Sequence, residues 1–385
     1  MSSILDKLLK GQKVEWKSLG QVTSLSRGRV MSKQYLTENV GDYPVYSSQT
    51  ANNGQIGKID SFDYDGEYVS WTTDGANAGT VFYRNGKFSI TNVCGLIKIK
   101  DLEELNYKFI YYWLSTQAKN YVYSGMGNPK LMSNQIEKIP VPIPPLEIQA
   151  KIVKILDAFT ALTAELTAEL TMREKQYHYY RDNLLTFSDD VEWKALGDVV
   201  LPTKNIKWKE TNLSYQYIDL SSVDRGNNNI GETLEITSKN APSRAQKIVK
   251  QDDIIFATTR PTQMRVAIIP KNFDEQIAST GYCILRANQK EILPKWIYYN
   301  LSLDRFKFYL EENQSGVAYP AISDGIVKEF QIPIPSLKEQ KRIIEILDNF
   351  EIFNHSITEG LPFEIALRQK QYEYYREQLL DFPKS

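Results

Sequence analysis

Two short segments combine a carboxylate with a lysine at a spacing that metal-dependent nucleases use. They are Glu15-x-Lys17 and Glu192-x-Lys194, and each encloses a tryptophan. Phosphodiester cleavage needs carboxylates that hold a divalent cation and a nearby group that stabilises the developing charge. A complete site requires a further carboxylate upstream, but only Asp6 precedes Glu15. We therefore interpret both segments as a strand or turn that seats a domain on a neighbouring helix.

Motifs for other chemistry are absent from the sequence. There is no Gly-x-x-x-x-Gly-Lys-Ser/Thr loop, so we do not expect the chain to bind ATP. An Asn/Asp-Pro-Pro-Tyr/Phe run and a glycine fingerprint for S-adenosylmethionine are also missing. His178 and His355 have no cysteine or carboxylate at ligand spacing, so we assign them surface or packing roles.

The composition is typical of a soluble protein with room for two or three domains. The chain has 385 residues, of which 42% are hydrophobic and 24% are charged, and a net charge of -1. This balance provides no global attraction for nucleic acid. No apolar run is long enough for a membrane span or a secretory signal, and two cysteines exclude a disulfide scaffold. We therefore expect a cytoplasmic protein.

The chain contains an internal repeat. Four pairs of blocks match: 14–17 (VEWK) with 191–194 (VEWK), 142–146 (PIPPL) with 333–337 (PIPSL), 152–159 (IVKILDAF) with 343–350 (IIEILDNF), and 173–187 (REKQYHYYRDNLLTF) with 368–382 (RQKQYEYYREQLLDF). The separation between matching blocks grows along the chain, so insertions lie between them. Each half is therefore a variable globular segment followed by a well-matched helical one.

The two globular segments, about 14–140 and 191–332, have the pattern of β-strands joined by turns. Runs such as 42–46, 68–71 and 253–256 are separated by clusters of Asn, Gly and Asp. Cys94 and Cys283 lie in comparable strand-like runs, and both segments end in a predicted helix and a loop.

The proline-rich exits of the two segments cannot continue a helix or a central strand, because proline lacks the backbone donor. We interpret 142–145 and 333–335 as hinges between rigid parts. A role as a ligand for a proline-binding module is the alternative, but each copy immediately precedes a helix.

Apolar residues after each exit recur at alternating steps of four and three, which predicts a heptad seam for a helical partner. The first seam runs from Ile148 to Phe187, and its alternation is interrupted by a duplicated Thr-Ala-Glu-Leu at 163–170. A four-residue insertion of this kind is a stutter. In the second seam, Gly360 and Pro362 should interrupt or kink the helix.

Each seam spans about 40 residues, or about 60 Å of helix, and one small domain cannot cover it. We therefore expect the two seams to pack against each other in an antiparallel manner. Phe382 corresponds to Phe187, which leads directly into the second VEWK block. By analogy, the C-terminus should lie close to the first VEWK block at 14–17, which makes the chain pseudo-circular.

This architecture resembles the specificity subunit of type I restriction-modification systems over nearly the whole chain. The residues that carry the resemblance are those of 162–170, 173–185, 356–362 and 368–380. The spacer residues Thr163, Leu166, Thr167 and Leu170 resemble the subclass in which tandem Thr-Ala-Glu-Leu units separate two recognition domains.

The resemblance implies an α+β fold in which two β-rich target-recognition domains are held apart by two long helices. These helices would form an antiparallel coiled coil with a pseudo-twofold internal repeat. The expected division is 1–140 for the first target-recognition domain, 141–190 for the first spacer helix region, 191–332 for the second domain and 333–385 for the second spacer helix region.

The function implied is noncatalytic. The chain would read a bipartite, asymmetric target in double-stranded DNA and bind two methyltransferase (modification) subunits, together with restriction/translocase subunits. S-adenosylmethionine, ATP and magnesium would be cofactors of those partners, and this chain would hold no cofactor or metal.

Each globular segment is nearly neutral, so DNA binding would depend on local clusters of charge. Base reading in the major groove uses amides, guanidinium groups and short hydroxyls on turns. Candidates in the first segment are Arg27, Arg29, Lys33, Ser47, Ser48, Gln49, Asn52, Asn53, Thr72, Thr73, Asp74 and Asn77. Candidates in the second segment are Lys204, Lys207, Lys209, Ser221, Ser222, Arg225, Asn227, Thr258, Thr259, Arg260, Gln263 and Arg265.

Two other classes of protein fit the sequence. One is a stand-alone bipartite DNA-binding protein, and the other is a coiled-coil scaffold that holds two protein-binding domains. The specificity subunit requires two methyltransferase-like partners per chain, the stand-alone reader requires none, and the scaffold requires a partner but no affinity for DNA.

Overall fold

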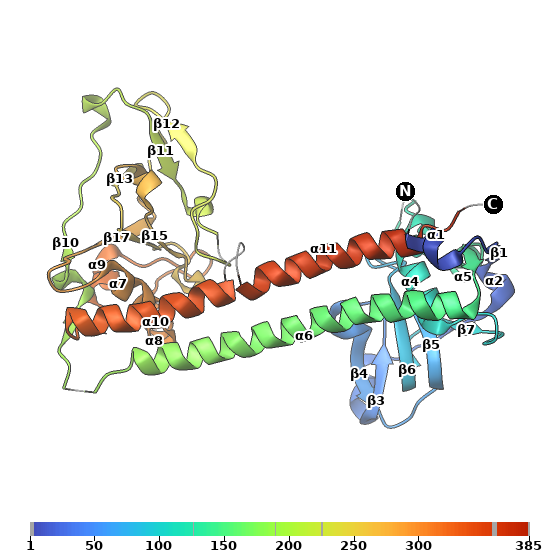
Figure 1. Cartoon of the computed structure of the whole chain (residues 1–385). Helices are drawn as coiled ribbons and strands as arrows, with labels where there is room; N and C mark the ends of the chain where they lie inside the picture. The colour runs from blue at the N-terminus through green and yellow to red at the C-terminus, as the bar shows by residue number, and fades with distance from the viewer. Residues whose placement is uncertain (1–3, 126, 189, 225, 356–359, 384–385) are drawn as a thin grey trace. The chain divides into compact units, whose positions relative to one another are not determined.

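A computed structural model describes residues 4–125, 127–188, 190–224, 226–355 and 360–383 of the chain (Figure 1). It contains two compact units, and each combines sheets with helices. Unit 1 consists of Met1–Glu165 and Ile365–Ser385, and unit 2 of Leu166–Glu364. The mixed α and β content agrees with the predicted α+β class. Among the described residues, no helix combines the length and apolar character needed to cross a membrane.

Unit 1 is built around one six-stranded sheet with the order β2-β7-β5-β6-β3-β4. Its strands are β2 (Thr23–Arg27), β3 (Val40–Tyr46), β4 (Gln55–Ile59), β5 (Tyr64–Thr72), β6 (Val81–Ile90) and β7 (Cys94–Ile99). Neighbouring strands are antiparallel except for β3 and β6, where Val45 lies opposite Ser89. The predicted strands at 42–46 and 68–71 are confirmed as parts of β3 and β5.

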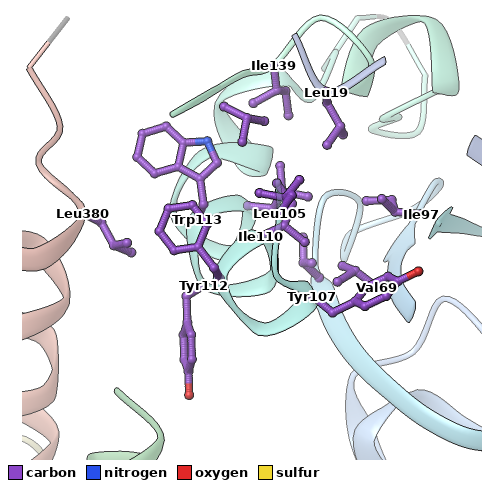
Figure 2. Close-up of a cluster of buried hydrophobic side chains, with 14 of the residues drawn as sticks. Leu19, Val69, Ile97, Leu105, Tyr107, Ile110, Tyr112, Trp113, Ile139 and Leu380 are labelled. Carbon is purple, nitrogen blue, oxygen red and sulfur yellow. The ribbon is translucent and has the colours of Figure 1, made fainter. Parts of the chain in front are cut away.

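Helix α4 (Tyr107–Gln117) covers this sheet and forms the centre of the unit 1 core (Figure 2). The side chain of Asn106 caps its first turn by accepting hydrogen bonds from the backbone N–H groups of Lys108 and Phe109. Ile110 and Leu114 are fully buried one turn apart, as expected for an amphipathic helix. Shorter helices of unit 1 are α1 (Ile4–Leu9), α2 (Leu19–Val22), α3 (Lys33–Glu38), η1 (Ala51–Gly54), η2 (Ala118–Tyr121) and α5 (Ser133–Ile136).

Unit 2 uses a related set of strands but divides it between two four-stranded sheets, with orders β10-β17-β14-β15 and β12-β11-β16-β13. Its strands are β9 (Trp193–Ala195), β10 (Val200–Leu201), β11 (Tyr215–Ile218), β12 (Leu234–Ile236), β13 (Ala245–Ile248), β14 (Ile254–Ala257), β15 (Val266–Ile268), β16 (Ile277–Ser279), β17 (Tyr282–Ala287) and β18 (Gln331–Pro333). Its short helices are η3 (Leu196–Asp198), η4 (Trp208–Glu210), η5 (Leu220–Ser222), η6 (Pro261–Gln263), η7 (Lys271–Phe273), α7 (Pro294–Leu301), α8 (Asp304–Asn313) and α9 (Asp324–Glu329).

The division of the unit 2 sheet has a local cause. In unit 1 the long strand β6 pairs with β5 along its length and with β3 at its end. In unit 2 the same two roles fall to separate strands, since β15 pairs with β14 and β16 pairs in parallel with β11. An insertion that includes η7 separates β15 from β16. Cys94 and Cys283 begin or lie in the matching strands β7 and β17, and both are buried free thiols.

Each proline-rich exit begins within a strand, and its remaining residues, 144–145 and 334–335, lie between that strand and the next helix, so the interpretation as hinges stays a prediction. Strand β8 (Pro140–Ile143) pairs antiparallel with β1 (Glu15–Ser18), and Trp16 lies opposite Pro142. Strand β18 pairs with β9 in the same way. Each ribbon has only two strands, and an edge position tolerates proline because its missing donor faces away from the partner. The interpretation of the Glu-x-Lys segments as a strand or turn is confirmed, since 15–17 lies in β1 and Lys194 lies in β9, which Glu192 directly precedes.

The helical seams are confirmed as α6 (Leu146–Leu184), α10 (Leu337–His355) and α11 (Gly360–Leu380). Helix α6 is continuous through the Thr-Ala-Glu-Leu duplication. The second seam is interrupted as predicted, since α10 ends at His355 and α11 begins at Gly360, whose φ is +76°. Residues 356–359, which contributed to the resemblance, lie outside the described residues.

Helices pack against each other within each unit. In unit 1 the ring of Phe159 on α6 stacks on Tyr375 of α11, with centroids 5.1 Å apart. In unit 2 Tyr180 of α6 stacks on Phe350 of α10 at 5.8 Å. The C-terminal end of the chain belongs to the unit 1 core, where Phe382 packs against Phe109.

The expected closeness of the C-terminus to the first VEWK block is confirmed. The indole Nε1 of Trp16 donates a hydrogen bond of 3.1 Å to the carbonyl of Pro383.

The same polar contacts anchor each globular segment to its long helix. In unit 1 the carboxylate of Asp157 on α6 accepts hydrogen bonds from Lys108 at 2.5 Å and Tyr112 at 2.7 Å. In unit 2 Asp348 on α10 accepts from Lys295 and Tyr299, both at 2.6 Å. The internal repeat therefore extends to the tertiary contacts that position the globular segments.

Candidate nucleic-acid interface

The Glu-x-Lys segments do not form nuclease sites. Lys17 forms an ion pair with Glu104, and Lys194 forms the equivalent pair with Glu291 at 3.0 Å. The glutamate of each segment is only a more distant partner of its lysine, at 3.7 Å for Glu15. Within the described ranges, no group of three or more His, Cys, Asp or Glu side chains is placed to hold a metal ion. The lysine of each segment thus takes part in a structural ion pair, and the seating of a domain on a helix by these segments stays a prediction.

Three loops of the first globular segment are joined by hydrogen bonds, and two of them carry predicted base-reading residues. We refer to them as loop 47–54, loop 72–79 and loop 123–131. The amide of Asn77 donates to the carbonyl of Ser48 at 3.4 Å, which links the first two loops. The backbone N–H of Gly75 donates to the carbonyl of Pro129 at 3.0 Å, which links the second and third. The fold therefore brings together polar turns that are far apart in the sequence.

Not every candidate in these loops is accessible. Thr72 and Thr73 are fully buried, and the hydroxyl of Thr73 donates to Asp74 at 2.6 Å. The hydroxyl of Thr72 donates to the carbonyl of Asn77. We therefore correct their assignment, because these side chains shape loop 72–79 and do not reach its surface. Sequence reasoning placed them on a turn, but Thr72 is the last residue of β5 and Thr73 follows it, and both lie inside the fold.

Asn52 and Asn53 are the most exposed candidates of loop 47–54. Both have left-handed backbone angles, with φ of 48° and 52°, and both residues are exposed. Asparagine tolerates this conformation better than most residues. The half-buried Ser47 and Gln49 bond within the molecule, to Thr91 and to the carbonyl of Gln55.

The three residues of the predicted basic cluster in the first segment have different surroundings. The guanidinium of Arg27 lies 3.0 Å from the sulfur of Met132, beside loop 123–131. Arg29 pairs with Asp63 at 3.1 Å and stacks on Tyr35 at 5.0 Å. Lys33 begins helix α3 and is exposed. Arg27 therefore lies next to loop 123–131, while Arg29 is partly neutralised by a carboxylate.

The second globular segment has an equivalent set: loop 219–222, loop 258–265 and loop 315–322. The backbone N–H of Arg260 donates to the carbonyl of Pro320 at 2.7 Å, and that of Ile322 donates to the carbonyl of Thr258 at 2.9 Å. These two bonds match those of Gly75 to Pro129 and of Leu131 to Thr73 in the first segment. Two segments with different sequences thus build the same loop frame.

Several candidates of the second segment are structural. Ser222 and Thr258 are buried, and the hydroxyl of Thr258 donates to the carbonyl of Gly281 at 2.9 Å. The guanidinium of Arg265 donates to the carbonyl of Leu220, so it points into the fold. Ser221 and Asn227 are exposed, and Thr259 and Gln263 are half-buried. Arg225 lies outside the described residues.

Arg260 stands out among the exposed candidates. Its φ is 51°, and the matching residue of the first segment is Gly75, with φ of +86°. A left-handed backbone is unfavourable for a residue with a Cβ atom. The Arg260 guanidinium lies over the ring of Tyr319 at 5.2 Å, and that ring is itself exposed. An arginine held in a strained position at the surface is a candidate for function.

The lysine cluster of the second segment lies elsewhere. Lys204, Lys207 and Lys209 are exposed, and their stretch of chain runs beside strand β13, to which it is joined by a bond from the Ile248 N–H to the carbonyl of Lys204 at 3.0 Å. Lys207 forms an exposed ion pair with Glu210 at 3.1 Å.

Sequence reasoning missed the third loop of each frame. Residues 124–129 (SGMGNP) and 315–320 (SGVAYP) share a Ser-Gly start and a proline at the same spacing. The offset in the chain between 124–129 and 315–320 equals the offset between the two proline-rich exits. This equal offset is the sequence signal that could have identified the two loops. In loop 315–322, the large apolar side chains of Val317 and Tyr319 are exposed. Arg84, a buried residue of β6, was also missed, because its position depends on packing.

Comparisons with known proteins agree with the repeated architecture. The family model for the type I restriction modification DNA specificity domain matches residues 12–172 and 188–367. A type I restriction enzyme specificity subunit of Escherichia coli is 34% identical over 412 residues, covering 99% of this chain and 98% of that protein. A type I specificity subunit of Mycoplasma pneumoniae is 32% identical over 373 residues, covering 94% of this chain and 96% of that protein.

A crystal structure of a type I S subunit from M. genitalium has the same fold. It matches with a TM-score of 0.60 and 16% identity, covering 97% of this chain and 98% of that one. Two matches of the specificity-domain model, one in each half, and two relatives that extend over almost the full length identify the chain as a member of the type I restriction-modification DNA specificity subunit family.

Proposed function

We propose that this noncatalytic specificity subunit reads a bipartite, asymmetric DNA target, with one half-site for each globular segment. The observation that carries the proposal is the duplicated loop frame, which presents different side chains from the same backbone arrangement. Asn52 and Asn53 offer amides in the first segment, and Arg260 offers a guanidinium group in the second. These groups match donor and acceptor patterns of base edges in the major groove.

The proposed division of labour follows the predicted domains. Residues 1–140 and 191–332 act as target-recognition domains, and 141–190 and 333–385 act as the spacer. The long helices would pair in an antiparallel coiled coil, and the tandem Thr-Ala-Glu-Leu units at 163–170 would set the spacing of the half-sites. The duplicated anchors Asp157 and Asp348 support this model, because they fix each segment to a long helix by the same contacts.

Two modification subunits and the restriction/translocase subunits are the proposed protein partners. They would supply S-adenosylmethionine, ATP and magnesium, and this chain would supply recognition. A repeat of two equivalent halves supports two equivalent docking positions for modification subunits.

Expression of the chain together with the modification subunits of its own system tests this proposal. Mapping of methylated adenines in the host DNA should then reveal one asymmetric target with two half-sites and a fixed gap. The purified chain alone, supplied with S-adenosylmethionine, ATP and magnesium, should neither methylate nor cut DNA. Binding to a bipartite site without co-purifying partners would instead support a stand-alone reader, and a partner without DNA affinity would support a scaffold.

A further inference from the structure

Arg84 is a buried arginine that is hydrogen-bonded to loop 47–54 from the interior of the first segment. Only 2% of it is exposed, and its Nη1 donates to the carbonyl of Asn53 at 2.8 Å. Its Nε donates to the hydroxyl of Ser70 at 3.0 Å, and its guanidinium lies over the ring of Tyr46 at 3.6 Å. The side chain therefore ties the exposed turn at Asn53 to strand β5.

No carboxylate within the described residues forms an ion pair with this guanidinium, and its Nη2 has no hydrogen-bond partner there. Burial lowers the pKa of Arg84 to about 10. Burial of a charge without an opposite charge is unfavourable, so the cost here is offset by hydrogen bonds and by the aromatic rings against which the guanidinium lies. Its hydrogen bonds go to the loop and to the strand that supports it.

In the second segment, Arg265 also bonds to the backbone of a loop, but from a different position relative to the sheet. Its Nη1 donates to the carbonyl of Leu220 in loop 219–222, and its buried Nε has no hydrogen-bond partner among the described residues. The hydroxyl of Tyr282 donates to the carbonyl of Asp219 at 2.9 Å and holds the other side of this loop. Each segment thus has an inward arginine whose bond goes to a loop carbonyl.

We propose that Arg84 and Arg265 are positioning residues for base recognition, each acting only on the half-site read by its own segment. The inference rests on the proposed bipartite function. Each guanidinium would fix the backbone of one loop, so that neighbouring exposed side chains meet base edges in one geometry. A lysine retains the charge, but a single ammonium cannot reach both Ser70 and Asn53 as the planar guanidinium does.

The test uses the full chain assembled with its modification subunits, and the variants Arg84→Lys, Arg84→Gln, Arg265→Lys and Arg265→Gln. Binding is measured on duplex libraries randomised in one half-site at a time, after methylation mapping has defined the target of the unchanged complex. The matched control is Arg286→Lys. Arg286 is also partly buried, but its guanidinium pairs with the buried carboxylate of Asp253 at 2.7 Å.

Both Arg84 variants should reduce the preference at one or more positions of the first half-site by about tenfold, and leave the second half-site unchanged. Both Arg265 variants should do the reverse. Arg286→Lys should lower thermal stability without a change in preference at either half-site. The lysine variants keep the charge and the alkyl stem, so they remain informative if a glutamine variant fails to fold.

Unchanged preferences in all four variants would overturn the inference, as would an equal weakening of both half-sites in each of them. If the unchanged complex recognises no bipartite target, the proposed function fails instead, and the two failures are therefore distinguishable.

Discussion

At Arg260 the effects of a substitution on stability and on DNA recognition can be measured separately. Its left-handed backbone conformation favours glycine, whereas its exposed guanidinium group can donate hydrogen bonds to a base. We predict that Arg260→Gly keeps the free energy of unfolding within about 1 kcal/mol of the original, since relief of the left-handed strain offsets the added flexibility. The preference at one base pair of the second half-site should fall by about 1–3 kcal/mol if this arginine reads guanine. Thermal denaturation and competition binding measure the two quantities. Arg260→Ala should lose the same preference while retaining the strain, and a glycine variant with full preference would contradict the assignment.

Lys207 is the contrasting case, because it is exposed and its partner Glu210 is exposed as well. An ion pair of this kind contributes at most about 1 kcal/mol to stability. Lys207→Ala should therefore fold normally and weaken binding to all DNA sequences alike. The slope of log affinity against log salt concentration should decrease by about one ion. A change in base preference, or an unchanged slope, would remove Lys207 from the set of phosphate contacts.

Helix α6 connects the two compact units, and the boundary between them falls after Glu165, inside the duplicated Thr-Ala-Glu-Leu. Deletion of residues 167–170 would remove about 6 Å of helix and also the stutter. For two readers on the same side of a duplex, half-site centres lie about 10–10.5 bp apart, which leaves a gap of about 6–7 bp. We predict that the deletion variant recognises the same half-sites with a shorter gap and has weak or no activity on the original target. Methylation mapping decides this, since full activity at the original gap would show that α6 does not set the spacing.

The two globular segments share a loop frame and an anchoring scheme, but each has its own core and its own sheets. We therefore predict that exchange of residues 191–332 for the matching segment of a relative changes one half-site and preserves the other. The exchanged segment takes β9 with it and nearly all of β18, so the ribbon that these two strands form is exchanged almost as a unit. Adenine mapping of the chimaera provides the measurement. A simultaneous change of both half-sites would exclude two independent readers.

Local patterns in the sequence were enough to predict the repeat, the helices α6, α10 and α11, several strands and the family resemblance. These features depend on periodicity, on turn residues and on blocks of identical residues, all of which are visible along the chain. The interruption at Gly360 was predictable for the same reason, since glycine and proline act on the backbone next to them.

The accessibility of each polar residue was decided by the tertiary structure. Thr73 and Asn53 look alike in sequence, as polar residues near turns, but Thr73 is buried directly after β5 and Asn53 is exposed. Long-range contacts also reveal loop 123–131 as a neighbour of loop 72–79, and place Arg84 beneath Asn53. The physical reason is that burial and hydrogen-bond partners depend on segments far apart in the chain, which only the packed fold brings together.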